Sequence, residues 1–419
     1  MPKQRLVVIG NGMAGARVVE EVLARGGAER FKIAVFSDEA SGSYDRMQLA
    51  DVMNGSQDEC EIVQRSFDWY QENQIQLNGG QRALLVSRPA RTVYGPAGVV
   101  ERYDKLVFAT GSSPYFPPLQ NLFDANGVRI DGVTGFRTLA DCRTITDLAA
   151  EARRVAVIGG GLLALEAARG LTGNGCEVHL IHSGSQLMNQ HLDEYGGQLV
   201  QRLVEREGIH VHLNRTVRAL IGERRVSGLL FSDGTSMACE LVVVSAGLIP
   251  NTWLAYQCGL TVERGIAVDA QLRSLDDRDI HALGECAQLR DRIHGSKDAI
   301  VEQARIVAAQ LVGDHSNARY DVQGGVSMKV MGMHVASIGN IRAIVDRDQI
   351  AEYRDPARNQ YKKVVLRDRR VIGAILLGDV SAFAALSHAF DSNARLSDAE
   401  LAALIAPTST TTKDWARVA

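Results

Sequence analysis

The chain has 419 residues, of which 46% are hydrophobic and 23% are charged, and its formal net charge is −3. This length exceeds what one hydrophobic core usually supports, so we expect two or three domains. The small net charge argues against a nucleic-acid-binding surface, and no apolar run approaches the length of a membrane span. A soluble, cytoplasmic protein is the expectation.

Residues 5–38 predict a strand, a helix and a second strand, because two apolar runs flank a segment with helical spacing. The turn after the first run reads Gly-Asn-Gly-Met-Ala-Gly. Its first glycine allows a tight turn, its second lets the backbone approach a pyrophosphate, and its third lets the helix pack closely on the strand. The helix then directs its first amide groups at the phosphates. The residues expected to bind a dinucleotide here are Gly10, Gly12, Met13, Ala14 and Gly15.

An acidic residue at the end of the second strand would complete such a site by bonding the ribose hydroxyls. Asp38 and Glu39 both follow the apolar run, and Asp38 is the residue that we select. A strand before the turn, a helix after it and an acid at this distance make the motif far more specific than the glycines alone.

Residues 154–183 repeat the same plan, with a turn that reads Gly-Gly-Gly-Leu-Leu-Ala. The third glycine is replaced by Ala164, which this type of turn permits. The ribose acid is missing, because the second strand is followed by His182. That histidine is either a ligand of a 2′-phosphate or a surface histidine at a strand end. The residues expected to bind a second dinucleotide are Gly159, Gly161, Leu162, Leu163 and His182.

The remaining segments extend this pattern. A strand and a Gly/Ser/Pro turn occupy residues 103–118, and a similar strand and turn occupy 240–251. From residue 319 the apolar runs alternate as in antiparallel strands, and residues 381–405 read as helix. The final segment is polar and rich in threonine, which is typical of a mobile tail.

These elements predict an α/β fold of two Rossmann-like three-layer domains, the second inserted in the first, and a small C-terminal α+β domain. Two turns of this kind in one chain have a simple explanation: one holds a flavin and the other receives a nicotinamide that reduces it. The expected domains are an FAD-binding domain at 1–117 and 246–318, an NAD(P)-binding domain at 118–245, an α+β interface domain at 319–405 and a flexible tail at 406–419.

Over about residues 5–390 the chain resembles the pyridine nucleotide–disulfide oxidoreductase superfamily. The resemblance depends on five motifs in order: "VIGNGMAG", "LVFATGSSP", "VAVIGGGLLALEAA", "VVVSAGLIPN" and "DIHALGECA". It implies the cofactors FAD and NAD(P)H, with Glu166 facing the nicotinamide. Around the cofactors it also implies Thr110, Gly111, Gly247, Gly284 and Glu285.

Within this superfamily the chain looks most like the flavoprotein front end of the NAD(P)H-dependent nitrite reductase large subunit. The segments "SGSYDRMQLADVM" and "LGECAQL" carry that similarity. It implies that Tyr44, Asp45 and Arg46 form a turn near the flavin. We expect the flavin itself to perform the redox step, and the candidate catalytic side chains near it are Arg46, Gln48 and Glu166.

The chain departs from these relatives in four respects. None of its six cysteines stands where disulfide reductases carry a redox cysteine, or at metal-ligand spacing, so we expect no metal. Where ferredoxin reductases often have a lysine near the flavin, the nearest candidates are Gln48 and Asp51. Residues 294–302 lack a Pro-Gly pattern. The sequence also shows no cluster or sirohaem domain, so we do not expect it to reduce nitrite alone.

The leading hypothesis is an FAD oxidoreductase that takes hydride from NAD(P)H and supplies a separate acceptor. The acceptor would be a rubredoxin-like, ferredoxin-like or nitrite-reductase-like protein, or a small molecule, and a homo-oligomer is possible. One alternative is a flavin oxidase, or an enzyme acting on a metabolite, with His294 or Lys297 in its pocket. Another is a non-catalytic flavin-containing interaction subunit whose second site is empty.

Overall fold

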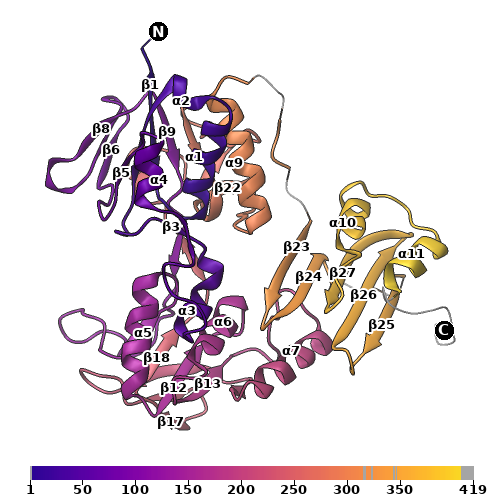
Figure 1. The fold of residues 1–419 in the computed structure, drawn as a ribbon. Coiled ribbons are helices and arrows are strands. Elements are labelled where there is room, and N and C mark those ends of the chain that lie inside the picture. Colours follow the sequence, from indigo (N-terminus) through magenta and orange to yellow (C-terminus); the bar gives the residue numbers. More distant parts are fainter. Residues whose placement is uncertain (1, 315–317, 322–323, 343–344, 346, 407–419) are drawn as a thin grey trace. The chain divides into compact units, whose positions relative to one another are not determined.

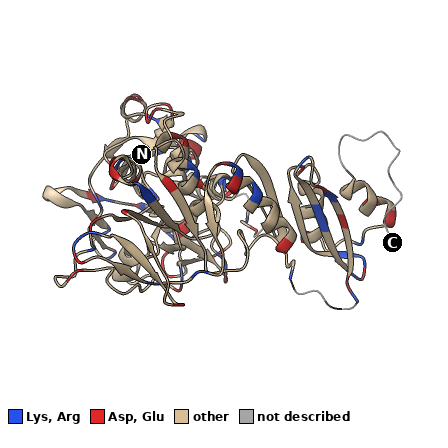
Figure 2. Cartoon of the chain, turned by 90° about the horizontal axis from the view of Figure 1, so that it is seen from below, with Lys and Arg blue, Asp and Glu red and all other residues tan. Residues whose placement is uncertain are grey.

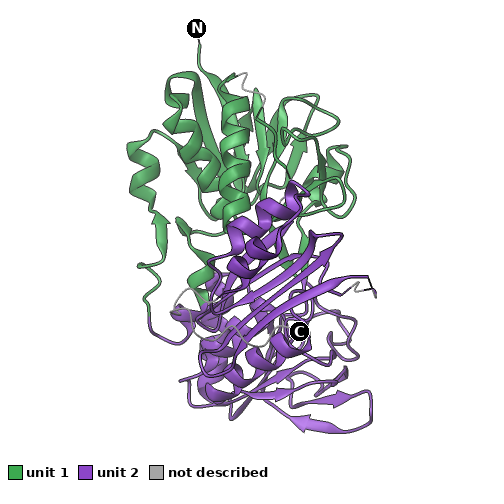
Figure 3. Cartoon of the chain, turned by 90° about the vertical axis from the view of Figure 1, so that its right-hand side faces the viewer, with its two compact units in different colours: residues 1–49, 57–114, 248–322 green, residues 50–56, 115–247, 323–419 purple. Residues whose placement is uncertain are grey.

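A computed structural model describes residues 2–314, 318–321, 324–342, 345 and 347–406 (Figure 1). The chain forms two compact units, coloured separately in Figure 3. Unit 1 comprises residues 1–49, 57–114 and 248–322, and unit 2 comprises residues 50–56, 115–247 and 323–419. Apart from Ala406, the tail predicted at 406–419 lies outside the described residues.

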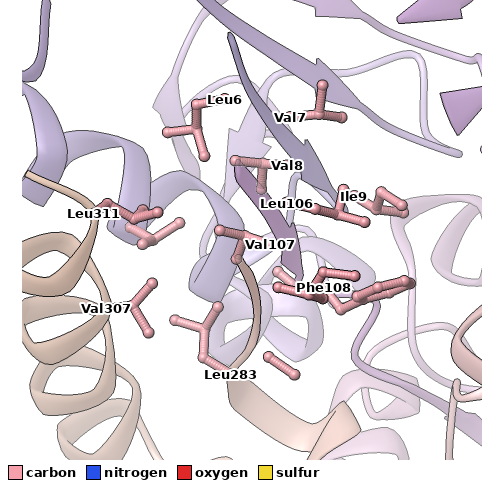
Figure 4. Packing of buried hydrophobic residues seen from close by; sticks show 14 of the residues in the cluster. Leu6, Val7, Val8, Ile9, Leu106, Val107, Phe108, Leu283, Val307 and Leu311 are labelled. Carbon is pink, nitrogen blue, oxygen red and sulfur yellow. The ribbon is translucent and has the colours of Figure 1, made fainter. Parts of the chain in front are cut away.

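Unit 1 is built on a five-stranded parallel sheet. In spatial order its strands are β21 (Ile280–Ala282), β9 (Lys105–Phe108), β1 (Gln4–Ile9), β2 (Phe31–Phe36) and β5 (Gln76–Asn78). The inner strands β1, β2 and β9 are mainly apolar because most of their residues are buried, whereas the edge strand β5 is partly exposed. Helices α1 (Met13–Ala24) and α9 (Lys297–Leu311) pack against each other and bury Val307 and Leu311 with the sheet residues shown in Figure 4.

An antiparallel sheet of β6 (Leu85–Ser87), β7 (Thr92–Tyr94) and β8 (Val100–Arg102) adds Val86 and Val93 to the same core. The connections of unit 1 are short elements. They are α2 (Gly27–Arg30), β3 (Ser43–Tyr44), η1 (Arg46–Gln48), β4 (Val63–Arg65), α4 (Phe67–Glu72), η2 (Pro96–Gly98), β10 (Ser112–Pro114), β19 (Leu248–Pro250), α8 (Trp253–Gln257), β20 (Ile266–Val268), η3 (Gly284–Cys286) and β22 (Ala287–Leu289).

The chain leaves unit 1 after β10 and returns to it at β19, and these two strands pair antiparallel, with Ser112 opposite Pro250. The intervening residues contain a complete second nucleotide-type fold. The predicted insertion of one α/β domain into another is therefore confirmed.

Unit 2 contains a second five-stranded parallel sheet. Its strands are β11 (Val133–Gly135), β18 (Leu241–Val244), β12 (Arg154–Ile158), β13 (Glu177–Ile181) and β14 (His210–His212). Its helices are α3 (Leu49–Met53), α5 (Leu139–Glu151), α6 (Leu162–Leu171) and α7 (Glu194–Arg206). An antiparallel sheet of β15 (Val217–Ile221), β16 (Gly228–Phe231) and β17 (Ser236–Ala238) shares a buried apolar cluster with β12 and β18.

The C-terminal part is a five-stranded antiparallel sheet with two helices, as the α+β prediction requires. Its strands, in spatial order, are β23 (Gly325–Val330), β24 (Met333–Gly339), β27 (Arg370–Leu377), β26 (Gln360–Arg367) and β25 (Gln349–Asp355). This sheet belongs to unit 2, and the separate domain predicted at 319–405 stays a prediction.

One predicted element was wrong. The helix expected across residues 381–405 is two helices, α10 (Phe383–Asp391) and α11 (Asp398–Ile405). Asn393 adopts a left-handed backbone conformation (φ +52°), which ends α10. Ser397 then begins α11 with a capping box, in which its side chain and that of Glu400 bond each other's backbone amides.

Charged side chains of both signs are interspersed along the described parts of the chain (Figure 2). No helix among the described residues is long and apolar enough to cross a membrane.

Candidate functional site

The first glycine turn, between β1 and α1, is fixed by close backbone contacts. Gly10 has φ +109°, and a Cβ there would lie 2.2 Å from the Ala109 carbonyl oxygen. A Cβ on Gly15 would lie 1.9 Å from the Gly10 carbonyl oxygen. Around Gly12, by contrast, the nearest atoms to a Cβ are in the Arg46 guanidinium, at 3.8 Å. Gly10 and Gly15 therefore serve the fold, while a Cβ at Gly12 would meet only the Arg46 side chain, in ordinary contact.

Helix α1 presents uncapped amide groups at this turn. Its N-cap is Gly12, no side chain caps it, and its first turn, which includes Met13, Ala14 and Gly15, has no acid. In the same turn Asn11 is 7% exposed, and its Oδ1 accepts a 2.5 Å hydrogen bond from the Tyr70 hydroxyl. The buried Nδ2 of Asn11 has no protein partner. The lack of a side chain at Gly12, the uncapped amides of α1 and the buried donor of Asn11 fit the pyrophosphate of a dinucleotide.

The two candidate ribose acids at the end of β2 lie in different surroundings. The Asp38 side chain is 64% exposed, and its nearest cation is Arg82, at 3.7 Å. The Glu39 side chain is 24% exposed and accepts 2.6 Å hydrogen bonds from the Tyr44 hydroxyl and from Arg46 Nη2. Because Arg46 also borders Gly12, Glu39 lies in the group of residues around the turn, and Asp38, which we had selected, faces solvent.

Asp45 organises the next stretch of chain. Its carboxylate is 5% exposed and accepts hydrogen bonds from the Met47 amide (3.1 Å) and from Gln48 Nε2 (3.4 Å). The Lys297 ammonium, at the start of α9, lies 3.0 Å from the same carboxylate. Lys297, a candidate pocket residue in the alternative hypothesis of a flavin oxidase or a metabolite-converting enzyme, is thus paired with Asp45. Arg46 and Gln48 are thus held in a compact polar turn.

The predicted Thr110–Gly111 turn is clamped by Asn251. Thr110 Oγ1 donates to the Asn251 carbonyl oxygen (2.6 Å), and Asn251 Nδ2 donates to the Thr110 carbonyl oxygen (2.9 Å). Ser113 Oγ donates to Asn251 Oδ1 (2.7 Å). Gly111 has φ +65° and no atom within 4 Å of a hypothetical Cβ, so it leaves space open. The role of Asn251 escaped sequence analysis because its partners lie about 140 positions away.

Glu285 and Gly284 are positioned by Ser112 and by α9. Glu285 Oε2 accepts a 2.7 Å hydrogen bond from Ser112 Oγ. The Gly284 amide donates to Oε1 of the buried Gln303 (2.7 Å), whose Nε2 donates to the His294 carbonyl oxygen (3.2 Å). His294, another predicted pocket residue, is partly buried, and burial lowers the pKa of its imidazole. Only the spacing of the "LGE" motif pointed to this loop, and nothing in the sequence pointed to Gln303.

The second glycine turn, between β12 and α6, repeats the geometry of the first. Gly159 has φ +148°, and a Cβ there would lie 2.2 Å from the Ser245 carbonyl oxygen. Gly161 is the N-cap of α6 and has no atom within 4 Å of a Cβ position. Leu162 and Leu163 begin the helix, whose first turn has neither a side-chain cap nor an acid. This arrangement fits a second pyrophosphate.

The ring of His182 lies against the second turn. A Cβ on Gly160 would be 2.4 Å from the His182 Cγ, and one on Gly184 would be 2.6 Å from its Nε2. The ring is partly buried, and its Nε2 has no protein partner. Burial lowers the pKa of His182, and a backbone hydrogen bond at Gln186 opposes this shift. His182 is therefore packed at the turn, which contradicts the interpretation of it as a plain surface histidine.

Glu166 on α6 is held by neighbouring groups. Its Oε2 accepts from Nε and Nη2 of Arg169, at 3.1 and 3.0 Å, and its side chain is 14% exposed. Gly247 has φ +134°, and its carbonyl oxygen accepts from the Tyr115 amide. The direction of Glu166 relative to a nicotinamide stays a prediction.

Two uncapped glycine turns, each between a parallel sheet and a helix of the same chain, are an arrangement that fits two dinucleotides. The chain belongs to the pyridine nucleotide-disulphide oxidoreductase family, whose model matches residues 4–310. The model of the rubredoxin NAD+ reductase C-terminal domain matches residues 326–394. The cofactors of the chain are accordingly FAD and NAD(P)H.

Curated relatives support the same family. The chain is 36% identical to a nitrite reductase [NAD(P)H] of Bacillus subtilis, over 98% of this chain and 50% of that protein. It is 30% identical to a nitric oxide reductase FlRd-NAD(+) reductase of Vibrio vulnificus, over 74% of this chain and 79% of that protein. The chain thus spans about half the length of the nitrite reductase that it matches.

Solved structures show the same fold. A putidaredoxin reductase in its covalent complex with putidaredoxin has a TM-score of 0.82 at 24% identity and covers 97% of this chain and 96% of its own. The NADH:rubredoxin oxidoreductase of Clostridium acetobutylicum has a TM-score of 0.77 at 20% identity and covers 95% of this chain and 97% of its own.

Proposed function

We propose that this enzyme takes hydride from NAD(P)H at the second glycine turn and delivers electrons to a separate redox protein. The acceptor is a rubredoxin-like or ferredoxin-like protein, or a nitrite-reductase-like partner. Bound FAD supplies the redox chemistry, since it accepts a hydride and releases electrons to an acceptor. The observation that carries the proposal is the pair of uncapped glycine turns, in which no backbone atom lies within 4 Å of a Cβ placed at Gly12 or at Gly161.

The protein residues in this proposal bind and orient. Gly12 and the first amides of α1 hold the FAD pyrophosphate, and Glu39 bonds the adenosine ribose in place of Asp38. Thr110 and Gly111, with Glu285, complete the flavin site. Gly161 and the first amides of α6 hold the pyrophosphate of the nicotinamide coenzyme, with Gly247 nearby. Glu166 faces the nicotinamide.

No thiol takes part in the proposed electron path. Cys286 adjoins Glu285, but it is fully buried, and burial raises the pKa of its thiol, so it stays protonated. None of the six cysteines forms a disulfide in the described part of the chain. Electrons therefore pass from coenzyme to flavin to acceptor without a disulfide step.

The names of similar proteins and domains support the proposed class of electron acceptor. The match at residues 326–394 is to a C-terminal domain of rubredoxin reductases. One relative is named an assimilatory nitrate reductase electron transfer subunit of Bacillus subtilis, at 34% identity over 90% of this chain and 48% of that protein. Both names describe proteins that hand electrons onward. We favour a flavin oxidase less, because Lys297, one of its two candidate residues, is paired with Asp45.

The test is an anaerobic titration of the purified yellow protein with NADH and NADPH. We expect bleaching of the flavin absorbance, then rapid reoxidation by an added rubredoxin or ferredoxin and slower reoxidation by oxygen. Mass spectrometry of the released cofactor should show FAD. Failure of both coenzymes to bleach the flavin would favour a non-catalytic subunit, and reoxidation that is fastest with oxygen would favour an oxidase.

A further inference from the structure

A chain of charged groups connects α6 to α3 in unit 2. Arg169 lies between two carboxylates: its Nε and Nη2 donate to Glu166 Oε2, and its Nη1 donates to Asp51 Oδ1 at 2.8 Å. The three side chains are 23%, 14% and 30% exposed for Arg169, Glu166 and Asp51. Partial burial reduces screening by solvent, so this arrangement is stronger than a surface ion pair.

The geometry of Arg169 restricts how Glu166 can move. The guanidinium is planar and permanently charged, and it bonds the two carboxylates through different nitrogen atoms. Nε and Nη2 donate to Glu166, and Nη1 donates to Asp51. Because Nη1 is hydrogen-bonded to Asp51, the guanidinium is also held on the side away from Glu166. Glu166 Oε1 also accepts a long hydrogen bond, 3.4 Å, from the Met331 amide. Both oxygens of Glu166 are thus engaged, which holds its side chain in one orientation.

The anchor itself is fixed by packing. Helix α3 lies on α6 at Gly170, where a Cβ would come within 3.0 Å of the Met53 Cβ and 3.1 Å of the Ala50 carbonyl oxygen. The absence of a side chain at Gly170 allows the two helices to approach closely. Asp51, between Ala50 and Met53 in α3, is consequently held in reach of Arg169.

Asp51 supplies the negative charge that pairs with the Nη1 end of the Arg169 guanidinium. A lysine at position 51 would face Arg169 and repel it. Here α6 supplies the cation itself, three residues after Glu166, and α3 supplies a second anion. The group carries one net negative charge, and only the guanidinium separates its two carboxylates.

We propose that Arg169, anchored by Asp51, is a positioning residue that fixes Glu166 and thereby sets the affinity of the second glycine turn for the nicotinamide coenzyme. The inference rests on the proposed function in one respect, which is that Glu166 faces the nicotinamide. According to this proposal, residues from two segments, residues 50–56 and helix α6, together determine the affinity of the second site for the coenzyme.

The experiment measures NAD+ binding to the FAD-loaded full chain by calorimetry. We expect Arg169→Met to raise Kd about tenfold, which corresponds to about 1.4 kcal/mol. Asp51→Asn, which leaves the hydrogen-bonding shape but removes the anchor's charge, should raise it about threefold. Arg169→Lys should fall between the native protein and Arg169→Met, because it keeps the charge and loses the planar fork. In steady-state kinetics these variants should raise KM for NADH more than they lower kcat.

The positioning role is tested by a double-mutant cycle. If Arg169 acts through Glu166, Glu166→Gln should raise Kd, and adding Arg169→Met to it should raise Kd no further. Arg202→Met, on the exposed surface of α7, is the matched control and should leave Kd unchanged. FAD content and melting temperature are measured for every variant, and if Arg169→Met does not fold, Arg169→Lys and Asp51→Asn decide the question.

Each outcome is assigned. Native Kd in Glu166→Gln would refute the role of Glu166 within the proposed function. The positioning role alone would be overturned if Glu166→Gln raised Kd while Arg169→Met kept the native Kd. If Arg169→Met does not fold, a native Kd in both Arg169→Lys and Asp51→Asn would overturn it in the same way. Additive effects of the two changes would also overturn it, since Arg169 would then act independently of Glu166.

Discussion

At the scale of single residues, the glycines of the first turn have different roles, which substitutions can distinguish. Gly12→Val should fold, because the nearest atoms to its Cβ are 3.8 Å away, but its side chain would occupy the pyrophosphate position and expel FAD. Gly15→Val should not fold, because its Cβ would lie 1.9 Å from the Gly10 carbonyl oxygen. The measurements are the flavin-to-protein absorbance ratio and circular dichroism. A folded Gly12→Val protein with a full complement of FAD would place the pyrophosphate elsewhere.

His182 gives a second prediction at this scale. Without a carboxylate at position 182, we expect kcat/KM for NADH and NADPH to agree within about tenfold, equivalent to roughly 1.4 kcal/mol. His182→Glu should shift preference toward NADH, because a carboxylate bonds the ribose hydroxyls and repels a 2′-phosphate. Burial lowers the pKa of His182. Any rise in kcat/KM for NADPH that protonation of His182 causes should therefore begin below pH 6.5, the usual pKa of histidine.

The coenzyme prediction is checked by steady-state kinetics with both coenzymes between about pH 5 and pH 8. His182→Gln, which keeps a polar side chain without a negative charge, is the control for the loss of the imidazole. An unchanged preference in His182→Glu would show that this strand end does not contact the adenosine ribose.

Sequence reasoning reached the glycine turns because their function requires particular residues at fixed spacing. It did not separate Asp38 from Glu39, because consecutive residues at a strand end point in different directions and only the fold decides which one meets Arg46. It also could not find the Arg169–Asp51 pair, whose members are 118 positions apart.

At the scale of elements, helix α9 holds the loop that carries Glu285. Gln303→Leu would leave the Gly284 amide and the His294 carbonyl oxygen without this partner, at a cost of about 1–3 kcal/mol for a buried unsatisfied group. We expect a lower melting temperature and faster release of FAD. Gln310→Leu, at a partly exposed position on the same helix, is the matched control. If the two substitutions had equal effects, Gln303 would stabilise helix α9 itself and not the loop that carries Glu285.

Element boundaries were predictable where apolar runs and helical spacing agree, as in β1, α1, β12 and α6. The single helix expected at 381–405 failed because its apolar spacing continues across the break. Asn393 and Ser397 carry the stop and start signals there, and both residue types also occur inside helices, so the pattern alone did not distinguish them.

At the scale of the whole molecule, buried histidines should make stability fall with acidity. Burial lowers the pKa of His281 to about 3, and burial with His212 and His210 lowers that of His179 to about 4. Unfolded histidine titrates near pH 6.5, so below that pH the unfolded chain takes up protons that the folded chain does not. Each such group then reduces the free energy of unfolding by up to about 1.4 kcal/mol per pH unit.

The check is the melting temperature between about pH 8 and pH 5, where we expect a steady fall below pH 6.5. His281→Leu should flatten this fall, since neither ring nitrogen of His281 has a protein partner to lose. His388→Leu, at an exposed position of α10, should leave the slope unchanged. A native protein as stable at pH 5 as at pH 8 would contradict the prediction.

The antiparallel pair β10–β19 also bears on how the molecule is made. Strand β9 pairs with β1 early in synthesis, but its other neighbour, β21, begins at Ile280, after the whole inserted fold has been translated. A ribosome adding about 5–20 residues per second leaves that edge of β9 without a partner for roughly ten seconds or more. An unpaired apolar edge is a site for wrong pairing between nascent chains. Folding of the insertion pairs β19 with β10, so that only residues 251–279 then remain to be added before β21 can cover this edge of β9.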